Sequence, residues 1–475
     1  MTLSVITGAP IGFPLTKFKP LASTKNSDLI SLINCPIFIS GINLIIFLGG
    51  SVLLLSCSNN SNILSGERQS ILPNFADISI NPDAANEIDL SLNETLKTDA
   101  SHAGGNERHS GGNLSLSFPL TLSWSARIKG IKDETIDLPQ PIISSGRVFA
   151  LDGNSELYAF DLETGKLLWS YILDPKADEH IPGIIGGIAY RDNMVVAHSG
   201  RNSLYALDAN TGDLIWRKSV DESLRGGPTL TELNSVILTD LDGRVYVFTL
   251  SNGMLLWQRA GFPVDTVVYG ASSPALFEQK IIVSGQAGEI AVYDLLSGDL
   301  NWADSLASFN PRTPLERLSD IRAFASTDDK NAYFISQSGR MSAFDVNLGY
   351  EIWDTPISGI EMPWVAGQSL FVVTIDGRLI CIRKSDGAVR WVTELPGAIP
   401  EGVAATQDLP RYIGPVIANG EVLAIHKSGE LFRFEALTGE LISKSKLTSQ
   451  ITTPLQIGDQ HLVALSRDGT IQVFN

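Results

Sequence analysis

The sequence predicts an all-β fold, an eight-bladed β-propeller of four-stranded antiparallel blades, with the ring closed by an N-terminal strand that joins the C-terminal blade. Three observations support this prediction: a motif recurs along the chain, an alternating apolar stretch precedes each copy, and incomplete units stand at both ends. The motif is Asp161-Leu-Glu-Thr-Gly-Lys-Leu-Leu-Trp169, and residues 208–216 repeat it closely. Looser copies end at Trp257, Trp302, Trp353 and Trp391.

The spacing of these tryptophans indicates the size of the repeated unit. Successive Trp residues from Trp169 to Trp391 lie 47, 41, 45, 51 and 38 residues apart. A period of this length is typical of propeller blades. A seventh copy, residues 429–443, has Ser443 where the others have Trp.

Each unit contains the signals of a blade. An alternating stretch such as residues 243–248 indicates a strand with one buried face. The Asp-x-x-Thr-Gly segment predicts a hairpin turn, because Asp and Thr can bond nearby backbone groups and Gly accepts a positive φ. The Trp that follows suits a wedge between neighbouring sheets, since it is large and apolar with one N–H to satisfy. A preceding strand is often entered through Pro, which removes no ladder bond at a first position: Pro141, Pro228, Pro274, Pro415 and Pro454.

The two ends of the repeat region predict how the ring closes. Residues 461–475 stop where a turn and an outer strand should follow. Residues 120–128 contain Trp124, 45 residues before Trp169, and have no preceding repeat. We therefore expect them to supply the missing outer strand. The propeller domain is then 118–475, with seven complete blades and one composite blade, and closure leaves only short protected edges.

The first segment, residues 1–57, is predicted to be a lipoprotein signal peptide. Lysines at 17, 19 and 25 precede a mostly apolar run, 37–55, that ends in Leu54-Leu-Ser-Cys57. A basic region, an apolar core and small residues at its end are typical of an export signal. The alternative is an uncleaved transmembrane helix, because the nineteen residues 37–55 are enough to span a bilayer.

The second segment, residues 58–117, is predicted to be a flexible tether. It is rich in Ser, Asn, Asp and Gly and shows no sustained periodicity. Within it, His102-Ala-Gly-Gly-Asn106 and His109-Ser-Gly-Gly-Asn113 form a duplicated motif. The two histidines lack nearby Cys or carboxylate support, so the sequence favours no metal site.

Composition and cysteine use limit the function classes. The chain is 44% hydrophobic and 18% charged, with a net charge of −17. Nucleic acid is not an expected partner, because binding a phosphate backbone requires basic surface. Of the three cysteines, Cys35 lies in the signal and Cys57 ends it. Cys381 aligns with Val247 and Ala159 of other repeats, which predicts a packed core thiol rather than a nucleophile.

The Asp-x-x-Thr-Gly-x-x-x-Trp repeat resembles that of the pyrroloquinoline-quinone-type propeller family. This family includes quinoprotein dehydrogenases and the BamB-type lipoproteins of the outer-membrane β-barrel assembly machinery. The dehydrogenases typically bring a Cys–Cys pair against the quinone and acidic residues around calcium, and this sequence has no adjacent Cys pair. The box Leu54-Leu-Ser-Cys57 resembles a lipoprotein signal, and residues 316–322 (Glu-Arg-Leu-Ser-Asp-Ile-Arg) resemble a BamB-type partner-binding loop.

The BamB-type resemblance implies a non-catalytic scaffold that needs no cofactor and assists assembly and insertion of outer-membrane proteins. It implies acylation of Cys57 and a place on the periplasmic face of the outer membrane of a Gram-negative bacterium. The implied partners are the barrel-inserting subunit, through its periplasmic domains, unfolded outer-membrane proteins, and the membrane through the lipid. The alternative is a periplasmic quinoprotein oxidoreductase that uses the quinone and calcium, or another ligand-binding propeller.

The resemblance also implies two partner-binding loops. One contributes Arg317, Leu318, Ser319, Asp320 and Arg322. The other contributes Val268, Tyr269 and Gly270, where Tyr269 replaces an Arg and offers an aromatic anchor. Both loops run from an outer strand to the innermost strand of the next blade, so we expect them on one face of adjacent blades. For residues 316–322 the alternative is a solvated connection with an Arg–Asp surface pair.

Overall fold

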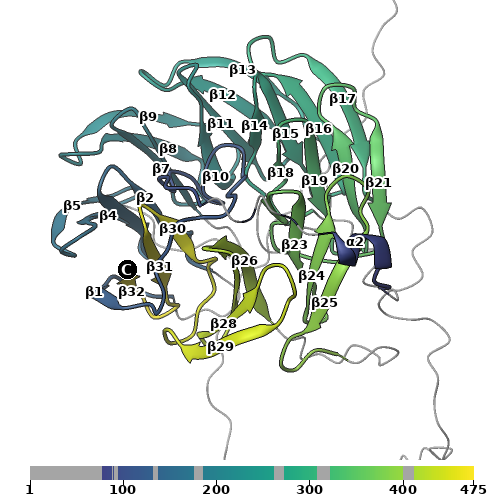
Figure 1. Cartoon of the computed structure of the whole chain (residues 1–475). Coiled ribbons are helices and arrows are strands. Elements are labelled where there is room, and N and C mark those ends of the chain that lie inside the picture. The colour runs from purple at the N-terminus through teal and green to yellow at the C-terminus, as the bar shows by residue number, and fades with distance from the viewer. Residues whose placement is uncertain are drawn as a thin grey trace, which may run out of the picture. The chain divides into compact units, whose positions relative to one another are not determined.

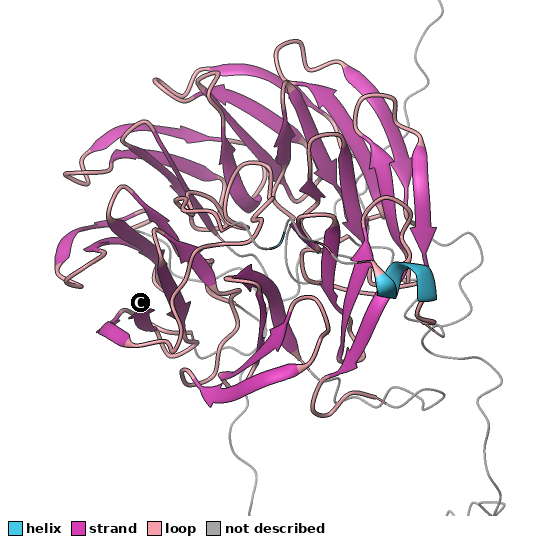
Figure 2. Cartoon of the chain, in the orientation of Figure 1, coloured by secondary structure: helices cyan, strands magenta, loops and turns pink. Residues whose placement is uncertain are grey.

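The structure is a computed structural model that describes residues 78–87, 89, 92, 95–131, 137–175, 186–261, 272–307, 321–399 and 411–475. All of them belong to one compact unit, Gln69–Asn475. They form eight four-stranded antiparallel sheets, which surround a common axis as a β-propeller (Figure 1). Figure 2 shows that strands dominate the described residues, and it also shows the short helix α2 (Pro82–Asn86). The predicted fold class is confirmed.

Each sheet is one blade, and the blades are numbered in chain order. The strands of each blade are given from the axis outward. Blade 1 is β2 (Ile142–Ser144), β3 (Arg147–Leu151), β4 (Glu156–Asp161) and β5 (Leu167–Ile172). Blade 2 is β6 (Gly187–Arg191), β7 (Met194–His198), β8 (Ser203–Asp208) and β9 (Leu214–Ser219). Blade 3 is β10 (Leu224–Leu230), β11 (Ser235–Asp240), β12 (Val245–Thr249) and β13 (Leu255–Arg259). Blade 4 is β14 (Ala275–Phe277), β15 (Lys280–Ser284), β16 (Glu289–Asp294) and β17 (Leu300–Ser305).

The remaining blades follow the same order, except for the last outer strand. Blade 5 is β18 (Ser326–Thr327), β19 (Asn331–Ile335), β20 (Met341–Asp345) and β21 (Glu351–Thr355). Blade 6 is β22 (Trp364–Ala366), β23 (Ser369–Val373), β24 (Arg378–Arg383) and β25 (Val389–Glu394). Blade 7 is β26 (Tyr412–Ala418), β27 (Glu421–His426), β28 (Glu430–Glu435) and β29 (Leu441–Lys446). Blade 8 is β30 (Gln456–Gly458), β31 (His461–Leu465), β32 (Thr470–Phe474) and β1 (Leu122–Arg127).

The ring closes through β1, as the sequence predicts. This strand pairs antiparallel with β32, with Trp124 opposite Val473. Beyond the pair, Thr121 and Asn475 exchange two backbone hydrogen bonds of 2.9 and 3.0 Å. Within the described residues, no helix has the length and apolar character needed to cross a membrane.

The Asp-x-x-Thr-Gly segments form the predicted turns between the third and fourth strands. In blade 1, Asp161 Oδ1 accepts hydrogen bonds from the backbone N of Thr164 at 2.9 Å and from its hydroxyl at 2.6 Å. Gly165 has φ 68° and donates its N–H to Asp161 O. The Asp side chain thus holds the turn, and the glycine supplies the left-handed conformation that closes it.

Each repeat tryptophan locks its blade to the next one. Its Nε1–H donates to the carbonyl of the first residue after the third strand of the following blade, at 2.6–3.1 Å: Trp124 to Leu162, Trp169 to Ala209, Trp216 to Leu250, Trp257 to Leu295, Trp302 to Val346, Trp353 to Lys384 and Trp391 to Ala436. The indole also lies on the turn glycine of that blade. A Cβ atom at Gly212 would lie 2.7 Å from the Trp169 ring, so only glycine leaves room for the contact.

On its own blade, each tryptophan faces a small or branched residue of the third strand. Trp391 lies opposite Cys381, and the equivalent pairs are Trp169–Ala159 and Trp257–Val247. Cys381 is 1% exposed, and burial raises the pKa of its thiol to about 12. The prediction of a packed core thiol is confirmed.

Blade 7 lacks its tryptophan for a structural reason. In blade 8 the third and fourth strands, β32 and β1, come from opposite ends of the sequence, so no glycine turn joins them to receive an indole from blade 7. Ser443 instead faces Arg433. The Arg433 guanidinium makes two hydrogen bonds with Glu421, of 2.6 and 2.7 Å, and lies 3.7 Å from the Phe118 ring centroid. A polar pair and a preceding aromatic residue therefore fill the seam between blades 7 and 8.

The proline expectation is only partly correct. Pro141 and Pro274 directly precede inner strands, as predicted. Pro228 and Pro415 instead lie inside β10 and β26. In both strands the pairing register shifts across the proline, between Arg225 and Thr229 and between Ile413 and Val416. A bulge of this kind tolerates a residue that has no N–H to donate.

The prediction of a flexible tether over residues 58–117 is wrong for residues 81–87 and 95–117. Residues 96–115, called the collar below, lie inside the ring (Figure 1, dark blue). Hydrogen bonds of 2.7–3.2 Å join the collar to every blade. Blade N–H groups donate to the collar from blade 8 (Asp459 N to Thr98 O), blade 1 (Ile143 N to Ala100 O), blade 2 (Tyr190 N to Ser101 O), blade 3 (Leu230 N to His102 Nε2), blade 4 (Leu276 N to Glu107 O) and blade 5 (Thr327 N to Arg108 O). Collar N–H groups donate to blade 6 (Gly112 N to Val365 O) and blade 7 (Leu114 N to Ile417 O). Most of these bonds use backbone groups, which leave no side-chain periodicity in the sequence.

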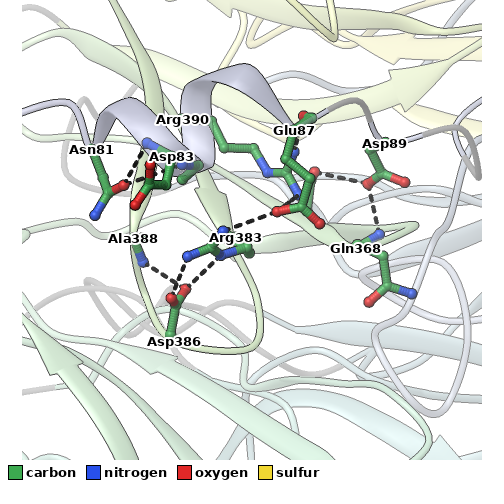
Figure 3. Close-up of polar contacts among 11 residues, drawn as sticks. Asn81, Asp83, Glu87, Asp89, Gln368, Arg383, Asp386, Ala388 and Arg390 are labelled. Atoms are coloured by element: carbon green, nitrogen blue, oxygen red, sulfur yellow. Dashed lines mark hydrogen bonds and ion pairs between the residues drawn. The ribbon is translucent and has the colours of Figure 1, made fainter.

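The residues before the collar fasten to blade 6 (Figure 3). Asn81 caps α2 by accepting from the N–H groups of Asp83 and Ala84. Arg383 donates to Glu87 Oε2 at 2.9 Å, and Arg390 donates to Glu87 O at 2.6 Å. These contacts place residues 81–87 against β25 at the outer edge of the blade.

We expect Trp216→Ala to open a cavity between blades 2 and 3 and to lower the free energy of unfolding by about 3–5 kcal/mol, the usual cost of truncating a large buried aromatic. Urea denaturation measures this. Ile215→Ala is the matched control, because Ile215 is the adjacent residue and is 46% exposed, whereas Trp216 is 7% exposed. A loss below about 1 kcal/mol for Trp216→Ala would show that the tryptophans do not lock the blades.

Candidate functional site

A cavity of ≈ 130 Å³ lies on the axis of the ring. Residues in or before the inner strands line it, and so do Ala103 and Gly104 of the collar. Glycines of blades 2 and 3 bring the wall close together, since a Cβ atom at Gly187 would lie 2.3 Å from Gly227 Cα. Apolar side chains such as Met362 complete much of the lining. The cavity is therefore a narrow space between backbone edges.

Four charged residues gather beside this cavity. Asp137, Arg322, Glu361 and Arg411 stand shortly before the inner strands of blades 1, 5, 6 and 7. Arg411 Nη2 lies 3.0 Å from Asp137 Oδ2, and Arg322 Nη2 lies 3.6 Å from the same oxygen. Because the Asp137 side chain is only 13% exposed, these pairs are screened less than surface pairs. One carboxylate thus links blade 1 to blades 5 and 7.

Glu361 completes the charged group with a perturbed ionisation. Burial raises the pKa of the Glu361 carboxyl above its ordinary value of 4.5, and Asp137 adds to the rise. Arg322, Arg411 and a backbone hydrogen bond with Gly414 act in the opposite direction without cancelling the effect of burial. The carboxyl therefore keeps its proton to a higher pH than an exposed glutamate does.

Only one of the predicted site residues lies within the described part of the chain. Arg322 is 21% exposed in its side chain and pairs with Asp137. The others lie outside the described residues: Cys57, Val268, Tyr269, Gly270, Arg317, Leu318, Ser319 and Asp320. For these residues the sequence assignment stays a prediction.

The described strands nevertheless fix where the two predicted loops begin and end. Residues 262–271 follow β13 and precede β14, and residues 308–320 follow β17 and precede β18. Each connection therefore enters an inner strand at its first residue. The four charged residues beside the cavity also come just before the first residues of inner strands. The strand ends that flank both predicted loops therefore lie on the same face as these charged residues.

Sequence reasoning missed Asp137, Glu361 and Arg411, and it did not place Arg322 in the cavity. The available signal was positional, since each of these residues comes shortly before an inner strand of its repeat. Their pairing joins blades that are not neighbours in the sequence, such as 1 and 5. Only the closed ring brings such residues together.

The duplicated histidines have structural roles. His102 accepts a hydrogen bond from Leu230 N at 3.0 Å, and burial lowers its pKa to about 3. His109 Nδ1 lies 3.0 Å from Ala325 O, and burial lowers the pKa of this ring to about 4. Both are 1% exposed and therefore neutral at physiological pH. No group of three or more His, Cys, Asp or Glu residues within the described ranges has the arrangement of a metal site.

A quinone and calcium do not find the donor set expected for them among the described residues. Cys381 is enclosed in the core of blade 6 opposite Trp391, away from the lining of the cavity. The two arginines beside the cavity are already engaged by Asp137. These side chains fit a neutralised structural cluster better than a cradle for an anionic cofactor.

Comparison with known proteins places these features in context. The sequence profile of the family described as outer membrane protein assembly factor BamB matches residues 153–393. An uncharacterized protein of Rickettsia conorii is 24% identical over 302 residues, which cover 63% of this chain and 72% of the relative. Outer membrane protein assembly factor BamB of Yersinia pestis is 23% identical over 365 residues, which cover 75% of this chain and 89% of the relative.

Solved structures show the same fold. BamB from Moraxella catarrhalis aligns with a TM-score of 0.62 at 20% identity, covering 75% of this chain and 99% of that one. Quinohemoprotein alcohol dehydrogenase from Comamonas testosteroni aligns with a TM-score of 0.60 at 12% identity, covering 82% of each chain. At such identities the likeness concerns the propeller alone, because one fold hosts unrelated functions.

The raised pKa of Glu361 predicts a pH-dependent effect of Glu361→Gln. Because the folded state binds this proton more tightly than the unfolded state, ionisation costs stability as pH rises above 4.5. We expect Glu361→Gln to raise the free energy of unfolding near neutral pH and to change it less near about pH 4, where the unfolded state is also largely protonated. Urea denaturation at the two pH values measures this difference.

Glu430→Gln is the control for this prediction, with the opposite sign. A hydrogen bond with Lys444 lowers the pKa of Glu430, so its ionised form is favoured in the folded state. Glu430→Gln should therefore lower stability near neutral pH. An effect of Glu361→Gln that is equal at both pH values would contradict the assignment of Glu361.

Proposed function

Because the chain belongs to the family of outer membrane protein assembly factor BamB, we propose that it is a non-catalytic scaffold that assists assembly and insertion of outer-membrane proteins. The match of the family profile to residues 153–393 carries this proposal. These residues extend from blade 1 to blade 6 and include both predicted partner-binding loops. In this proposal the partner is the barrel-inserting subunit of the β-barrel assembly machinery, bound through its periplasmic domains.

The docking surface in this proposal is the face where the connections enter the inner strands. The connections from blade 3 to blade 4 and from blade 4 to blade 5 are neighbours around the ring. The first supplies Val268, Tyr269 and Gly270, and the second supplies Arg317, Leu318, Ser319, Asp320 and Arg322. Asp320 offers a charge to a basic group of the partner, and Tyr269 offers an apolar anchor.

Arg322 has a supporting part in this proposal. Its guanidinium lies 3.6 Å from Asp137, with 21% of the side chain exposed. The pair fastens the C-terminal end of the second loop to blade 1 across the axis. The ion pair therefore fixes the side chain of Arg322, which follows Asp320 by two residues in the sequence.

The proposed location is the periplasmic face of the outer membrane, with a lipid on Cys57. The box Leu54-Leu-Ser-Cys57 and the basic, apolar leader before it support this location. Ser58 is not the Asp that commonly retains lipoproteins at the inner membrane. Unfolded outer-membrane proteins, delivered to the same machinery, are further proposed partners.

A quinoprotein oxidoreductase is the alternative that the repeat leaves open, since a quinohemoprotein alcohol dehydrogenase shares the propeller fold. Thermal unfolding with and without pyrroloquinoline quinone and calcium discriminates between the two, since a ligand that binds the folded state raises the unfolding temperature. No shift is expected for the scaffold, and a saturable rise would favour the oxidoreductase.

We expect mass spectrometry of the protein from a bacterial envelope to find a mature N-terminus at Cys57 carrying acyl chains. Membrane fractionation should place the protein with the outer membrane. Cys57→Ser removes the acylated sulfur and should release the protein from that fraction. An unmodified N-terminus, or co-fractionation of the wild type with the inner membrane, would exclude the proposed anchor.

Asp320→Ala should weaken binding to the periplasmic domains of the barrel-inserting subunit by about 2 kcal/mol or more, the usual effect of truncating one member of a buried charge pair. Asp320→Lys should weaken it further through like-charge repulsion, and Tyr269→Ala should also weaken it. Isothermal titration calorimetry measures the affinities, and urea denaturation checks that each variant is folded.

Asp299→Lys is the matched control for charge reversal. Asp299 is an exposed residue in the turn between β16 and β17, at the end of blade 4 opposite to the proposed docking loops. This variant should bind as the wild type does. Unchanged affinity in both Asp320→Lys and Tyr269→Ala would show that the partner uses another surface.

A further inference from the structure

The collar binds the ring as a peptide ligand binds a sheet edge. In each blade the innermost strand has one neighbour, so its other edge presents unpaired backbone groups toward the axis. Collar residues occupy these edges, with antiparallel bridges of Ala100 to Ile143 and of His102 to Ala189, and a parallel bridge of Leu114 to Ala418. Addition of an extended segment to an exposed edge is a recurring mode of peptide recognition.

The collar makes one circuit of the axis and closes on itself. Its bonds with the blades follow the order of the ring, from blade 8 through blade 1 to blade 7. At the end of the circuit its two ends meet, because Leu96 N donates to Asn113 O at 2.7 Å and Ser115 N donates to Leu96 O at 2.8 Å. The collar therefore forms a closed loop inside the axial channel, which is the space enclosed by the eight inner strands.

The channel selects glycine at defined positions of the collar. A Cβ atom at Gly111 would lie 1.9 Å from the Trp364 ring. The same indole donates its Nε1–H to Gly112 O at 2.8 Å. Trp364 is the only Trp in an inner strand of the described blades, and it forms a flat surface over which only a chain without a side chain can pass.

The histidines of the duplicated motif, His102 and His109, anchor the part of the collar that precedes these glycines. His102 accepts from Leu230 N in blade 3, and the His109 ring faces Ala325 O in blade 5 and packs on Phe324 with ring centroids 5.0 Å apart. The motif therefore alternates a buried imidazole with glycines that let the backbone approach the ring. Backbone bonds, shape and two side-chain anchors together make a specific complex.

We infer that the axial channel of this propeller is a binding site for an extended, glycine-containing peptide, and that the collar is its ligand in cis. Occupancy by the collar closes the site to other peptides, so the N-terminal segment is autoinhibitory toward this channel. This inference is independent of the proposed docking function, since it concerns the inner strand edges and not the loops.

Occupancy in cis also bridges the seam between blades 7 and 8, which lacks a Trp contact. The collar bonds to blades 7, 8 and 1, on both sides of the seam where Ser443 replaces a tryptophan. Asn113 adds a bond across the same region, since Gly420 N donates to its Oδ1 at 2.9 Å. A peptide in the channel therefore joins blades that no indole locks together.

A displaced collar tests the inference in the full-length protein. Gly111→Leu places a side chain where the Trp364 ring lies, so we expect it to expel the collar and free the channel. A fluorescent synthetic peptide of residues 95–116 should then bind saturably to the Gly111→Leu protein and not to the wild type, measured by fluorescence anisotropy. The same peptide carrying Gly111→Leu should not bind either protein.

Ser110→Ala is the matched control, because the hydrogen bonds of Ser110 with Asn106 use only its backbone groups. The Ser110→Ala protein should keep its collar in place and should not bind the peptide, as expected for the wild type. Circular dichroism establishes that the variants are folded. Peptide binding to the wild type and Gly111→Leu alike, or to neither folded protein, would overturn the inference.

Amide hydrogen exchange of the wild type gives a second test that needs no variant. The N–H groups of Ala100, Gly112 and Leu114 donate to inner-strand carbonyls, so their exchange should be slowed as strongly as that of strand residues such as Val148. Exchange of these three amides at the rate of a free peptide would overturn the proposed occupancy, even if Gly111→Leu failed to fold.

Discussion

The contact between an indole on the outer strand of one blade and the glycine turn of the next is the interaction on which this ring depends. It satisfies the indole N–H, packs the ring on the turn glycine, and sets the distance between neighbouring sheets. The turn must then have glycine, both for its positive φ and for the space that the ring occupies. The Asp-x-x-Thr-Gly-x-x-x-Trp repeat supplies the glycine and the Trp of this contact, which forms at seven of the eight interfaces between blades.

The eighth interface shows what happens when the receiving turn is missing. Blade 8 takes its outer strand from the other end of the sequence, and blade 7 has Ser443 where an indole would have no turn to cover. Arg433, Glu421 and Phe118 fill the seam, and the collar crosses it from inside. Closing a ring with strands from distant parts of the chain thus required a different set of contacts at one place.

The charged group and the collar both lie at the axis of the ring. The charged group of Asp137, Arg322, Glu361 and Arg411 lies on the face where the described inner strands begin. The collar bonds to the inner strands of the ring, and its Ala103 and Gly104 line the cavity beside this charged group. In the proposed function a partner binds at this face, while the collar occupies the space between the inner strands.

The sequence predicts those parts of the fold that depend on repeated side chains. The blade period, the Asp-x-x-Thr-Gly turns, the Trp locks, the closing strand and the core position of Cys381 all follow from aligned residues, and the structure confirms them. The collar escaped prediction because its hydrogen bonds are mostly backbone bonds that any residue can make. The charged group escaped because Asp137 meets Arg322 only after the ring has closed. Pro228 and Pro415 lie in bulges, which leave no pattern of their own.

Site-specific photo-crosslinking in the native envelope shows whether this propeller docks through the face that carries the two predicted loops. A photoreactive residue at position 320 stands in the predicted docking loop, and one at Asn234 stands in the exposed turn between β10 and β11 on the opposite face. We expect a crosslink from position 320 to the barrel-inserting subunit and none from position 234. Crosslinks from position 234 alone, or from neither position in a correctly localised protein, would contradict it.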